Sequence, residues 1–252
     1  MTTSLFNYKL KFAYDGTAYN GWQVQPNAVA IQEIIEKAIF TLIREKIRII
    51  GSGRTDAGVH ALEQVAHFKC TKQIDTRRFF QAINGMLPHD IRLLSIEEAP
   101  LSFHAQRSAL RKIYHYHICL NPIVMPFERL YRYHVRKRIS LPLLEEAAKL
   151  FVGSHDFTSY ANSGTEGACK KNPVRTIYRL DVIKTADGVR LEFEGNGFLY
   201  KMVRNITGML LDVASGRHSL EDINKIFEAK DRRIAPKSAP AQGLFLIKVI
   251  YP

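Results

Sequence analysis

The chain has 252 residues, 46% of them hydrophobic, which is enough to bury the core of one large domain or of two small ones. Its 36 Lys and Arg exceed its 24 Asp and Glu by 12, and this basic balance favours binding to nucleic-acid phosphates. Because it has no long apolar run, no leader pattern and only three scattered cysteines, the sequence excludes a membrane-spanning helix, a disulfide framework and a Cys-x-x-Cys zinc site, and a cytoplasmic location is expected.

Hydrophobic periodicity in the first hundred residues predicts alternating strands and helices. Between Tyr8 and Tyr14, apolar residues alternate with lysines, which is the period of a half-buried strand. Apolar residues then recur at helical spacing from Ile31 to Leu42, and predict a core-facing helix that Pro26 and Asn27 open. The remaining elements expected here are strands at 47–50 and 64–69, a helix at 76–87 and a strand at 91–96.

A polar loop with three glycines joins the strands predicted at 47–50 and 64–69. It reads Gly51-Ser52-Gly53-Arg54-Thr55-Asp56-Ala57-Gly58-Val59-His60-Ala61. Glycine permits backbone angles that other residues avoid, and it lets a bulky group approach closely. One interpretation is a long turn braced by an Asp–Arg ion pair. The other is that Asp56, kept ionised by the nearby Arg54, is a nucleophilic carboxylate.

The second half repeats the same order of elements. The expected elements are a strand at 113–120, a helix at 141–152, a hairpin of strands at 175–184 and 189–194, helices at 198–214 and 220–229, and a strand at 244–250. Apart from the helix at 220–229, which is inserted before the last strand, each half therefore reads as a βαββαβ unit, the split βαβ arrangement of a ferredoxin-like lobe. We expect an α+β protein with mainly antiparallel sheets, lobes at 1–105 and 106–252, and a basic ligand-binding cleft between them.

The basic residues are concentrated in one segment. Between Gln106 and Arg138 there are eight Lys and Arg residues against a single acid, Glu128. Tyrosines are interleaved with them, and cations beside aromatic rings are typical of sites that bind unpaired RNA. The alternative for each tyrosine is that it packs in the core of its strand. The long polar connections at 121–138 and 159–174 are expected near the RNA rather than in the core.

Spacing excludes several familiar interpretations of the glycine loop. Asp56 stands where a dinucleotide-binding fingerprint needs its third glycine, and no Gly-Lys-Ser/Thr sequence follows for a phosphate-binding loop. The chain also lacks the His-Cys-Cys set of a zinc deaminase. What is left is one carboxylate that is able to act as a nucleophile or to brace a turn.

The segment Gly53-Arg54-Thr55-Asp56-Ala57-Gly58-Val59-His60 resembles the active-site motif of the tRNA pseudouridine synthase A family. The resemblance extends along almost the whole chain. Its other islands are Tyr14-Asp15-Gly16-Thr17, Gly21-Trp22-Gln23, Asn84-Gly85-Met86-Leu87-Pro88, Ser102-Phe103-His104-Ala105, Gly153 with His155-Asp156-Phe157, Met202-Val203-Arg204-Asn205-Ile206, Ala239-Pro240 and Gly243-Leu244.

The resemblance implies the residues of an active site. It makes Asp56 the catalytic nucleophile, Tyr114 the tyrosine that stacks on the target base, and Arg204 the basic partner of the aspartate. Arg54, Arg107 and Arg111 are expected as further substrate contacts. The chain has Gln106-Arg107 where the family more usually has Arg-Phe, which puts one phosphate contact in doubt unless Arg107 replaces it.

The resemblance also implies an activity and its partners. The expected reaction isomerises uridine to pseudouridine at positions 38, 39 and 40 of the tRNA anticodon stem-loop, with base flipping and without a cofactor or metal. The expected assembly is a homodimer that binds tRNA. The aspartate could add to the uracil ring or attack the sugar carbon, and a glycal route that begins with proton abstraction is also open.

Two other functions compete with this one. A non-catalytic RNA-binding module would use the same arginines and tyrosines, but a carboxylate aimed at polyanionic RNA would weaken its binding. A carboxylate hydrolase of nucleotides or sugars would need a second catalytic carboxylate near Asp56, and the loop supplies none.

Overall fold

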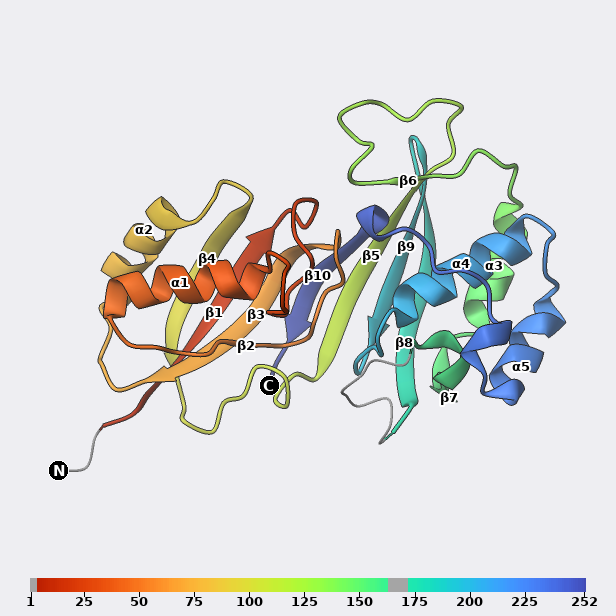
Figure 1. Cartoon of the computed structure of the whole chain (residues 1–252). Helices are drawn as coiled ribbons and strands as arrows, with labels where there is room; N and C mark the ends of the chain where they lie inside the picture. The colour runs from red at the N-terminus through yellow and green to blue at the C-terminus, as the bar shows by residue number, and fades with distance from the viewer. Residues whose placement is uncertain (1–3, 163–171) are drawn as a thin grey trace. The chain divides into compact units, whose positions relative to one another are not determined.

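The computed structural model describes residues 4–162 and 172–252, and the chain divides into two compact units (Figure 1). Unit 1 comprises Met1–Leu110 and Phe245–Pro252, and unit 2 comprises Arg111–Leu244. Five α-helices and mostly antiparallel strands make the described part an α+β structure, as the sequence predicts. The lobes predicted at 1–105 and 106–252 stay a prediction about domains.

Unit 1 is a sheet covered by two helices. Its elements are β1 (Phe6–Tyr14), α1 (Ile31–Ile43), β2 (Ile50–Gly51), β3 (His60–Cys70), α2 (Thr76–Met86), β4 (Ile91–Ala99) and the C-terminal strand β10 (Leu244–Ile250). The strand β1 lies between β4 and β3 and is antiparallel to both. On the other edge of β3, β2 pairs in antiparallel fashion and β10 in parallel fashion. The other four strands of unit 1 thus follow the order β4-β1-β3-β2.

The period of two in β1 buries one face of this sheet. Tyr8, Leu10 and Phe12 are fully buried, and the ring of Tyr8 packs against Phe68 of β3. Phe68 in turn contacts Phe79 of α2. Burying a large apolar side chain contributes about 1.5 to 3 kcal/mol, so this face fixes the sheet from which the aspartate loop projects.

The first helix begins later than its sequence predicts. Pro26 and Asn27 do not open it; they form a turn between the bridged residues Gln25 and Ala28, and Asn27 has a φ of 59°. A left-handed residue cannot continue into a helix, so α1 begins at Ile31. The apolar positions that predicted the helix are correct, since Ile31, Ile35 and Ile39 are buried.

Unit 2 contains mostly antiparallel strands and three α-helices. Its elements are β5 (Arg111–Cys119), β6 (Tyr133–His134), α3 (Leu141–Lys149), β7 (Gly153–Asp156), η1 (Thr158–Tyr160), β8 (Val174–Thr185), β9 (Gly188–Gly195), α4 (Met202–Ala214), α5 (Leu220–Ala229), η3 (Arg232–Ile234) and η4 (Ala241–Gly243). The strands follow the order β5-β9-β8-β7, and β6 pairs in parallel with the end of β5. The connection expected at 159–174 lies partly outside the described residues.

The helix α4 forms the core of unit 2. Eleven of its thirteen residues are buried, and it packs against α3. It begins at Met202 and not at the predicted Phe198, because Lys201 has a left-handed φ of 59° and the residues before it form a turn. Phe198 lies just before that turn, and its ring packs against Tyr114 of β5 and Phe193 of β9.

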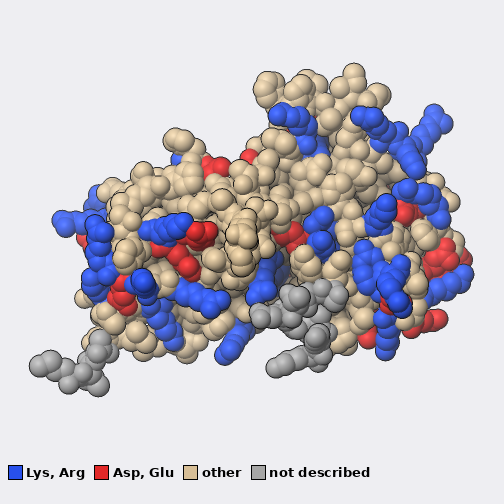
Figure 2. All heavy atoms as spheres, in the orientation of Figure 1, with Lys and Arg blue, Asp and Glu red and all other residues tan. Residues whose placement is uncertain are grey.

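The surface matches the basic composition of the chain. Figure 2 shows Lys and Arg side chains across the face of the molecule in view, with acidic side chains among them. Cys70 and Cys119 are buried free thiols. No helix in the described ranges is long and apolar enough to cross a membrane.

Candidate active site

The aspartate loop joins β2 to β3 and is fixed first by its own ends. Ser52 is fully buried; its backbone N–H donates to the Val65 carbonyl at 2.7 Å and its hydroxyl donates to Oε1 of Gln64 at 2.7 Å. Nε2 of Gln64 donates to the carbonyl oxygen of Gly53 at 2.9 Å. A buried glutamine on β3 therefore binds the start of the loop from both ends of its amide.

The centre of the loop is fixed by residues that precede α1. The Thr55 carbonyl accepts the backbone N–H of Trp22 at 3.1 Å, and the Thr55 hydroxyl is 2.9 Å from that of Tyr14. After Asp56 the chain turns, because the Val59 N–H donates to the Asp56 carbonyl at 3.1 Å. Asp56 is half-buried beside the buried Thr55, so its backbone is anchored while its side chain keeps access to solvent.

Close approaches at three glycines bring these segments together. A Cβ at Gly16 would lie 2.0 Å from the Val59 carbonyl oxygen, and one at Gly21 would lie 2.4 Å from the Thr55 carbonyl oxygen. Gly21 also has a φ of 86°, which favours glycine. At Gly51 a Cβ would lie 2.7 Å from the ring of Trp22. The absence of a side chain at these three positions is therefore a packing requirement of the loop that carries Asp56.

Arg54 does not pair with Asp56, contrary to the expectation from the sequence. Its side chain is exposed, and among the residues that the structure describes no carboxylate pairs with it. The fixed cation that the sequence places beside the aspartate instead faces solvent. Arg54 is thus available to an external anion.

His60 and His67 are two buried histidines of β3 whose rings accept backbone hydrogen bonds. Nδ1 of His60 accepts the Gly16 N–H at 3.1 Å, and the ring of His60 stacks on Phe245 at 4.5 Å. Nδ1 of His67 accepts the Ala105 N–H at 3.1 Å. Burial, followed by the neighbouring His104, lowers the pKa of His67 to about 4. Both imidazoles are therefore bonded within unit 1.

Arg107, an expected substrate contact, lies in a turn organised by a histidine. Nδ1 of His104 accepts the backbone N–H groups of Gln106 at 3.2 Å and of Arg107 at 3.3 Å. The side chains of Gln106 and Arg107 are exposed. The Ser102-Phe103-His104-Ala105 island therefore presents Arg107 at the surface of unit 1.

Tyr114 and Tyr116 point to the same face of β5, but their surroundings differ. Tyr114 is 8% exposed, and its ring meets the ring of Phe198 edge-on at 5.2 Å. Tyr116 is fully buried and donates its hydroxyl to the Pro240 carbonyl at 2.8 Å. Burial raises the pKa of Tyr116 well above its usual value. Tyr116 is therefore a core residue, and Tyr114 is the one that retains exposure.

Arg204 is held at the first turn of α4. Its Nε donates to the Ala239 carbonyl at 2.8 Å, and the Ala239 N–H donates back to the Arg204 carbonyl at 2.9 Å. The helix approaches this segment closely, since a Cβ at Gly208 would lie 2.1 Å from the Lys237 carbonyl oxygen. The Arg204 side chain is half-buried. Its guanidinium group is oriented by backbone that is 35 residues away in sequence.

The start of β5 carries Arg111, an expected substrate contact, and Lys112, which was not among the expected contacts. Arg111 donates to Oε1 of Glu194 at 2.9 Å and its guanidinium group lies 4.9 Å from the ring centre of Tyr178. Lys112, two residues before Tyr114 and on its face of β5, is half-buried. Burial, with the charge of Arg175, lowers the pKa of Lys112 to about 8. In the sequence, only its spacing of two residues from Tyr114 on a predicted strand indicates that the two side chains share a face.

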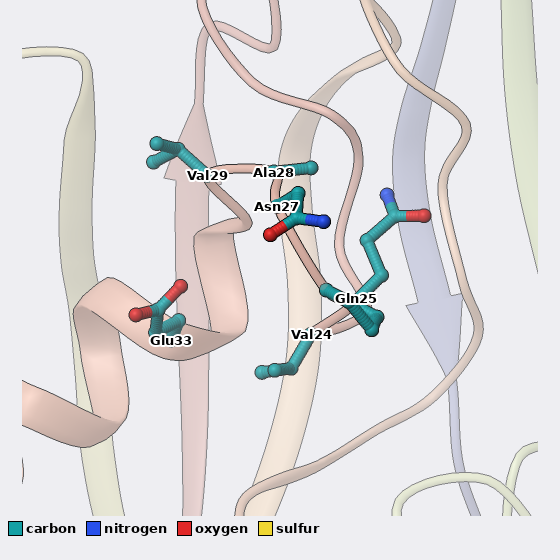
Figure 3. A pocket seen from close by; sticks show the side chains of 7 residues that line it. Val24, Gln25, Asn27, Ala28, Val29 and Glu33 are labelled. Atoms are coloured by element: carbon teal, nitrogen blue, oxygen red, sulfur yellow. The ribbon is translucent and has the colours of Figure 1, made fainter.

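A surface depression in unit 1 contains none of the expected site residues. It is lined by the 24–29 turn and the start of α1, and Figure 3 shows Gln25 and Glu33 among its polar side chains. Across the described ranges, no group of three or more His, Cys, Asp or Glu side chains is placed to hold a metal ion.

Comparison with known proteins identifies the family of this chain. The sequence matches the family described as tRNA pseudouridine synthase over residues 11–106 and 147–252. It is 55% identical to tRNA pseudouridine synthase A 1 of Protochlamydia amoebophila, over 97% of this chain and 96% of that protein. It is 46% identical to tRNA pseudouridine synthase A of Chlamydia muridarum, over 96% and 91% of the two chains. The Bacillus subtilis protein of that name is 43% identical, over 96% and 98%.

These matches cover nearly the full length of this chain and of each relative. They confirm the resemblance that the Asp56 motif and the other islands carry. The chain belongs to the tRNA pseudouridine synthase A family of isomerases.

Proposed function

We propose that the protein isomerises uridine to pseudouridine at positions 38, 39 and 40 of the tRNA anticodon stem-loop. The observation that carries the proposal is the 55% identity to a tRNA pseudouridine synthase A over 97% of the chain. The net charge of +12 supports a polyanionic substrate. We also propose that the fold consists of two ferredoxin-like lobes with a basic active-site cleft. The strand order β4-β1-β3-β2 of unit 1 supports the first of these lobes.

The reaction exchanges one bond of the uridine for another. The N1–C1′ glycosidic bond breaks, the C5–C1′ bond forms, the hydrogen of C5 leaves as a proton, and N1 gains a proton. Apart from this exchange of a proton with water, the product has the same atoms as the substrate. The enzyme must therefore supply a reactive group and retain the detached uracil. A carboxylate and an aromatic ring are able to fill these two roles.

In this proposal Asp56 supplies the carboxylate. Its loop is braced by Trp22, Gly21 and Gln64, and it leaves the side chain half-buried. A fixed backbone lowers the cost of orienting a nucleophile toward its target. The same carboxylate serves whether it adds to the uracil ring, attacks C1′ or begins a glycal route by removing a proton.

Tyr114 holds the base and Arg204 pairs with the aspartate in the same proposal. Stacking on an aromatic ring contributes about 1 to 3 kcal/mol per base and tolerates rotation of that base. The edge contact of Phe198 supports the ring of Tyr114, and the Ala239 carbonyl supports the Arg204 guanidinium group. Arg54, Arg107 and Arg111 bind phosphates, and this binding offsets the few kcal/mol that flipping a nucleotide costs.

The proposed partners are tRNA and a second copy of the chain. One chain of 252 residues is small for a whole tRNA, which supports a homodimer. The proposed location is the cytoplasm, and no cofactor or metal is assigned to the reaction. Analytical ultracentrifugation that finds only monomer at full activity would contradict the dimer.

Tritium release tests the function directly. Transfer RNA labelled with tritium at C5 of uracil is incubated with the wild type and with Asp56→Asn, which keeps the size of the side chain but removes the carboxylate. The wild type is expected to release tritium to water and the variant to release none, while both bind tRNA. Equal release from both would remove Asp56 from the mechanism. Tight binding with no release from either would identify a non-catalytic RNA-binding module.

A further inference from the structure

Arg232 is a half-buried arginine whose hydrogen-bond acceptors are all neutral. It lies in η3 of unit 2, and its guanidinium group donates to the carbonyls of Ala235 and Pro236, each at 2.9 Å. It also donates to Oδ1 of Asn205 at 3.0 Å and to Oδ1 of Asn162 at 3.3 Å. These four contacts use all three guanidinium nitrogens, so the side chain binds two backbone carbonyls and two amides at once.

Asn205 connects Arg232 to the helix that carries Arg204. Asn205 is 1% exposed and directly follows Arg204 in α4. Its Nδ2 donates to the Tyr160 carbonyl at 2.8 Å and to Oδ1 of Asn162 at 3.0 Å. Its Oδ1 accepts from Arg232 and from the hydroxyl of Ser238. The hydrogen-bonding capacity of this buried amide is therefore used fully.

The 235–240 segment lies between this network and Arg204. Arg232 binds its first two carbonyls, Ser238 binds Asn205, and Gly208 lets α4 approach the Lys237 carbonyl oxygen. At its far end the Pro240 carbonyl accepts the Tyr116 hydroxyl. Held at both ends, the segment presents the Ala239 carbonyl to Nε of Arg204.

We propose that Arg232 is a positioning residue: through the 235–240 segment it fixes the Ala239 carbonyl, and this carbonyl orients the guanidinium group of Arg204 for pseudouridine formation. The proposal rests on the proposed function for its catalytic consequence. Its structural core is the chain of contacts from Arg232 through Ala239 to Arg204. Lysine cannot replace Arg232, because an ammonium group lacks the planar fork that reaches four acceptors.

A double-mutant cycle tests the connection. Arg232→Gln is expected to lower kcat for tRNA at least tenfold with KM within about threefold of the wild type. Arg204→Lys keeps a cation but has no Nε–H for the Ala239 carbonyl, so adding Arg232→Gln to it should lower kcat less than twofold further. Additive losses would overturn the proposal, as would an Arg232→Gln enzyme with the kcat of the wild type.

Arg233 provides the matched control. It is the neighbouring arginine, its side chain is 89% exposed, and it pairs with Asp231. Arg233→Gln is expected to keep the kcat and KM of the wild type. A loss of kcat in Arg233→Gln as large as that in Arg232→Gln would overturn the specific role of Arg232.

An NMR measurement separates this proposal from the proposed function. The Nε–H cross-peak of Arg204, assigned by its loss in Arg204→Lys, should move in Arg232→Gln and stay in place in Arg233→Gln. An unchanged cross-peak would overturn the proposal even if the enzyme releases tritium. A wild type that releases no tritium would overturn the proposed function but not the positioning of Arg204 by Arg232. If Arg232→Gln does not fold, Ser238→Ala, which removes one hydrogen bond to Asn205, enters the same cycle and the same NMR comparison.

Discussion

Asp56 and Arg204 are held in place by different means. Asp56 lies on a loop that is fixed through its backbone: the Thr55 carbonyl accepts from Trp22, the Gly53 carbonyl accepts from Gln64, and Gly16 and Gly21 let the 16–22 segment approach closely. Arg204 lies on a buried helix, and its guanidinium group is oriented by a carbonyl that is 35 residues away. Both sites depend on contacts between residues more than 30 positions apart, but the Asp56 loop also carries its glycines and its acid in one short stretch, which makes it visible as a local motif.

The two tyrosines of β5 give the largest expected effects. Tyr116→Ala removes a fully buried ring and its bond to Pro240, and should lower the free energy of unfolding by about 3 to 5 kcal/mol. Tyr114→Ala removes the proposed stacking partner, worth about 1 to 3 kcal/mol, and should lower kcat/KM about 5- to 150-fold. Urea unfolding and tritium release measure the two effects separately.

The paired phenylalanine variants sharpen this contrast. Tyr114→Phe keeps a ring and should retain most activity. Tyr116→Phe loses one hydrogen bond and should lower the free energy of unfolding by about 0.5 to 1.5 kcal/mol. Equal losses of kcat/KM in Tyr114→Ala and Tyr116→Ala, at equal stability, would show that Tyr114 has no special role at the base.

The glycine contacts of the aspartate loop give the next largest effect. Gly21→Ala places a Cβ 2.4 Å from the Thr55 carbonyl oxygen at a φ of 86°, so it should lower the free energy of unfolding by about 2 to 4 kcal/mol and reduce turnover at least tenfold. Thermal unfolding and tritium release check both.

Gly85→Ala is the control for Gly21→Ala. A Cβ at Gly85 would meet no atom within 4 Å, and the residue lies in α2. Alanine is favoured over glycine in a helix, so this variant should be more stable by about 0.5 to 1 kcal/mol with unchanged turnover. A destabilised Gly85→Ala beside a stable Gly21→Ala would contradict the packing account of the loop.

Hydrophobic periodicity predicts helices in both units but not the residues at which they begin. Periodicity located α1 and α4, but it misplaced the start of α1 at Pro26 and of α4 at Phe198, because left-handed residues near these starts are invisible to an apolar pattern. The Asp56 loop was found from adjacent glycines and an acid. The orientation of Arg204 by Ala239 was not, since hydrophobic spacing contains no information about which distant carbonyl a guanidinium group reaches.

A pH experiment probes His67, a buried histidine of β3. The pKa of His67 is about 4 in the folded protein, against about 6.5 when unfolded. Above pH 6.5 the imidazole of His67 is neutral in both states. Between pH 6.5 and pH 4 it is protonated only in the unfolded chain, so the free energy of unfolding decreases as the pH is lowered through this range. The loss should reach about 2 to 3 kcal/mol near pH 4.

His67→Gln isolates this contribution. Glutamine is able to accept the Ala105 N–H through its amide oxygen without titrating. The melting temperature of His67→Gln should therefore depend less on pH between 6.5 and 4 than that of the wild type. Identical pH profiles for the two proteins would show that another group is responsible for the acid sensitivity.

The smallest expected effect compares Arg54 of unit 1 with Arg111 of unit 2, two of the three arginines proposed to bind phosphates. Arg54 is exposed without a carboxylate partner in the described ranges, whereas Arg111 already donates to Glu194 at 2.9 Å. Each phosphate contact contributes about 0.7 to 0.9 to the slope of log K against log salt. Arg54→Gln should lower the slope for tRNA binding by about that amount, and Arg111→Gln by less, because its charge is already neutralised by Glu194. Binding measured at several salt concentrations decides this, and a larger change for Arg111→Gln would mean that Glu194 releases Arg111 to the RNA.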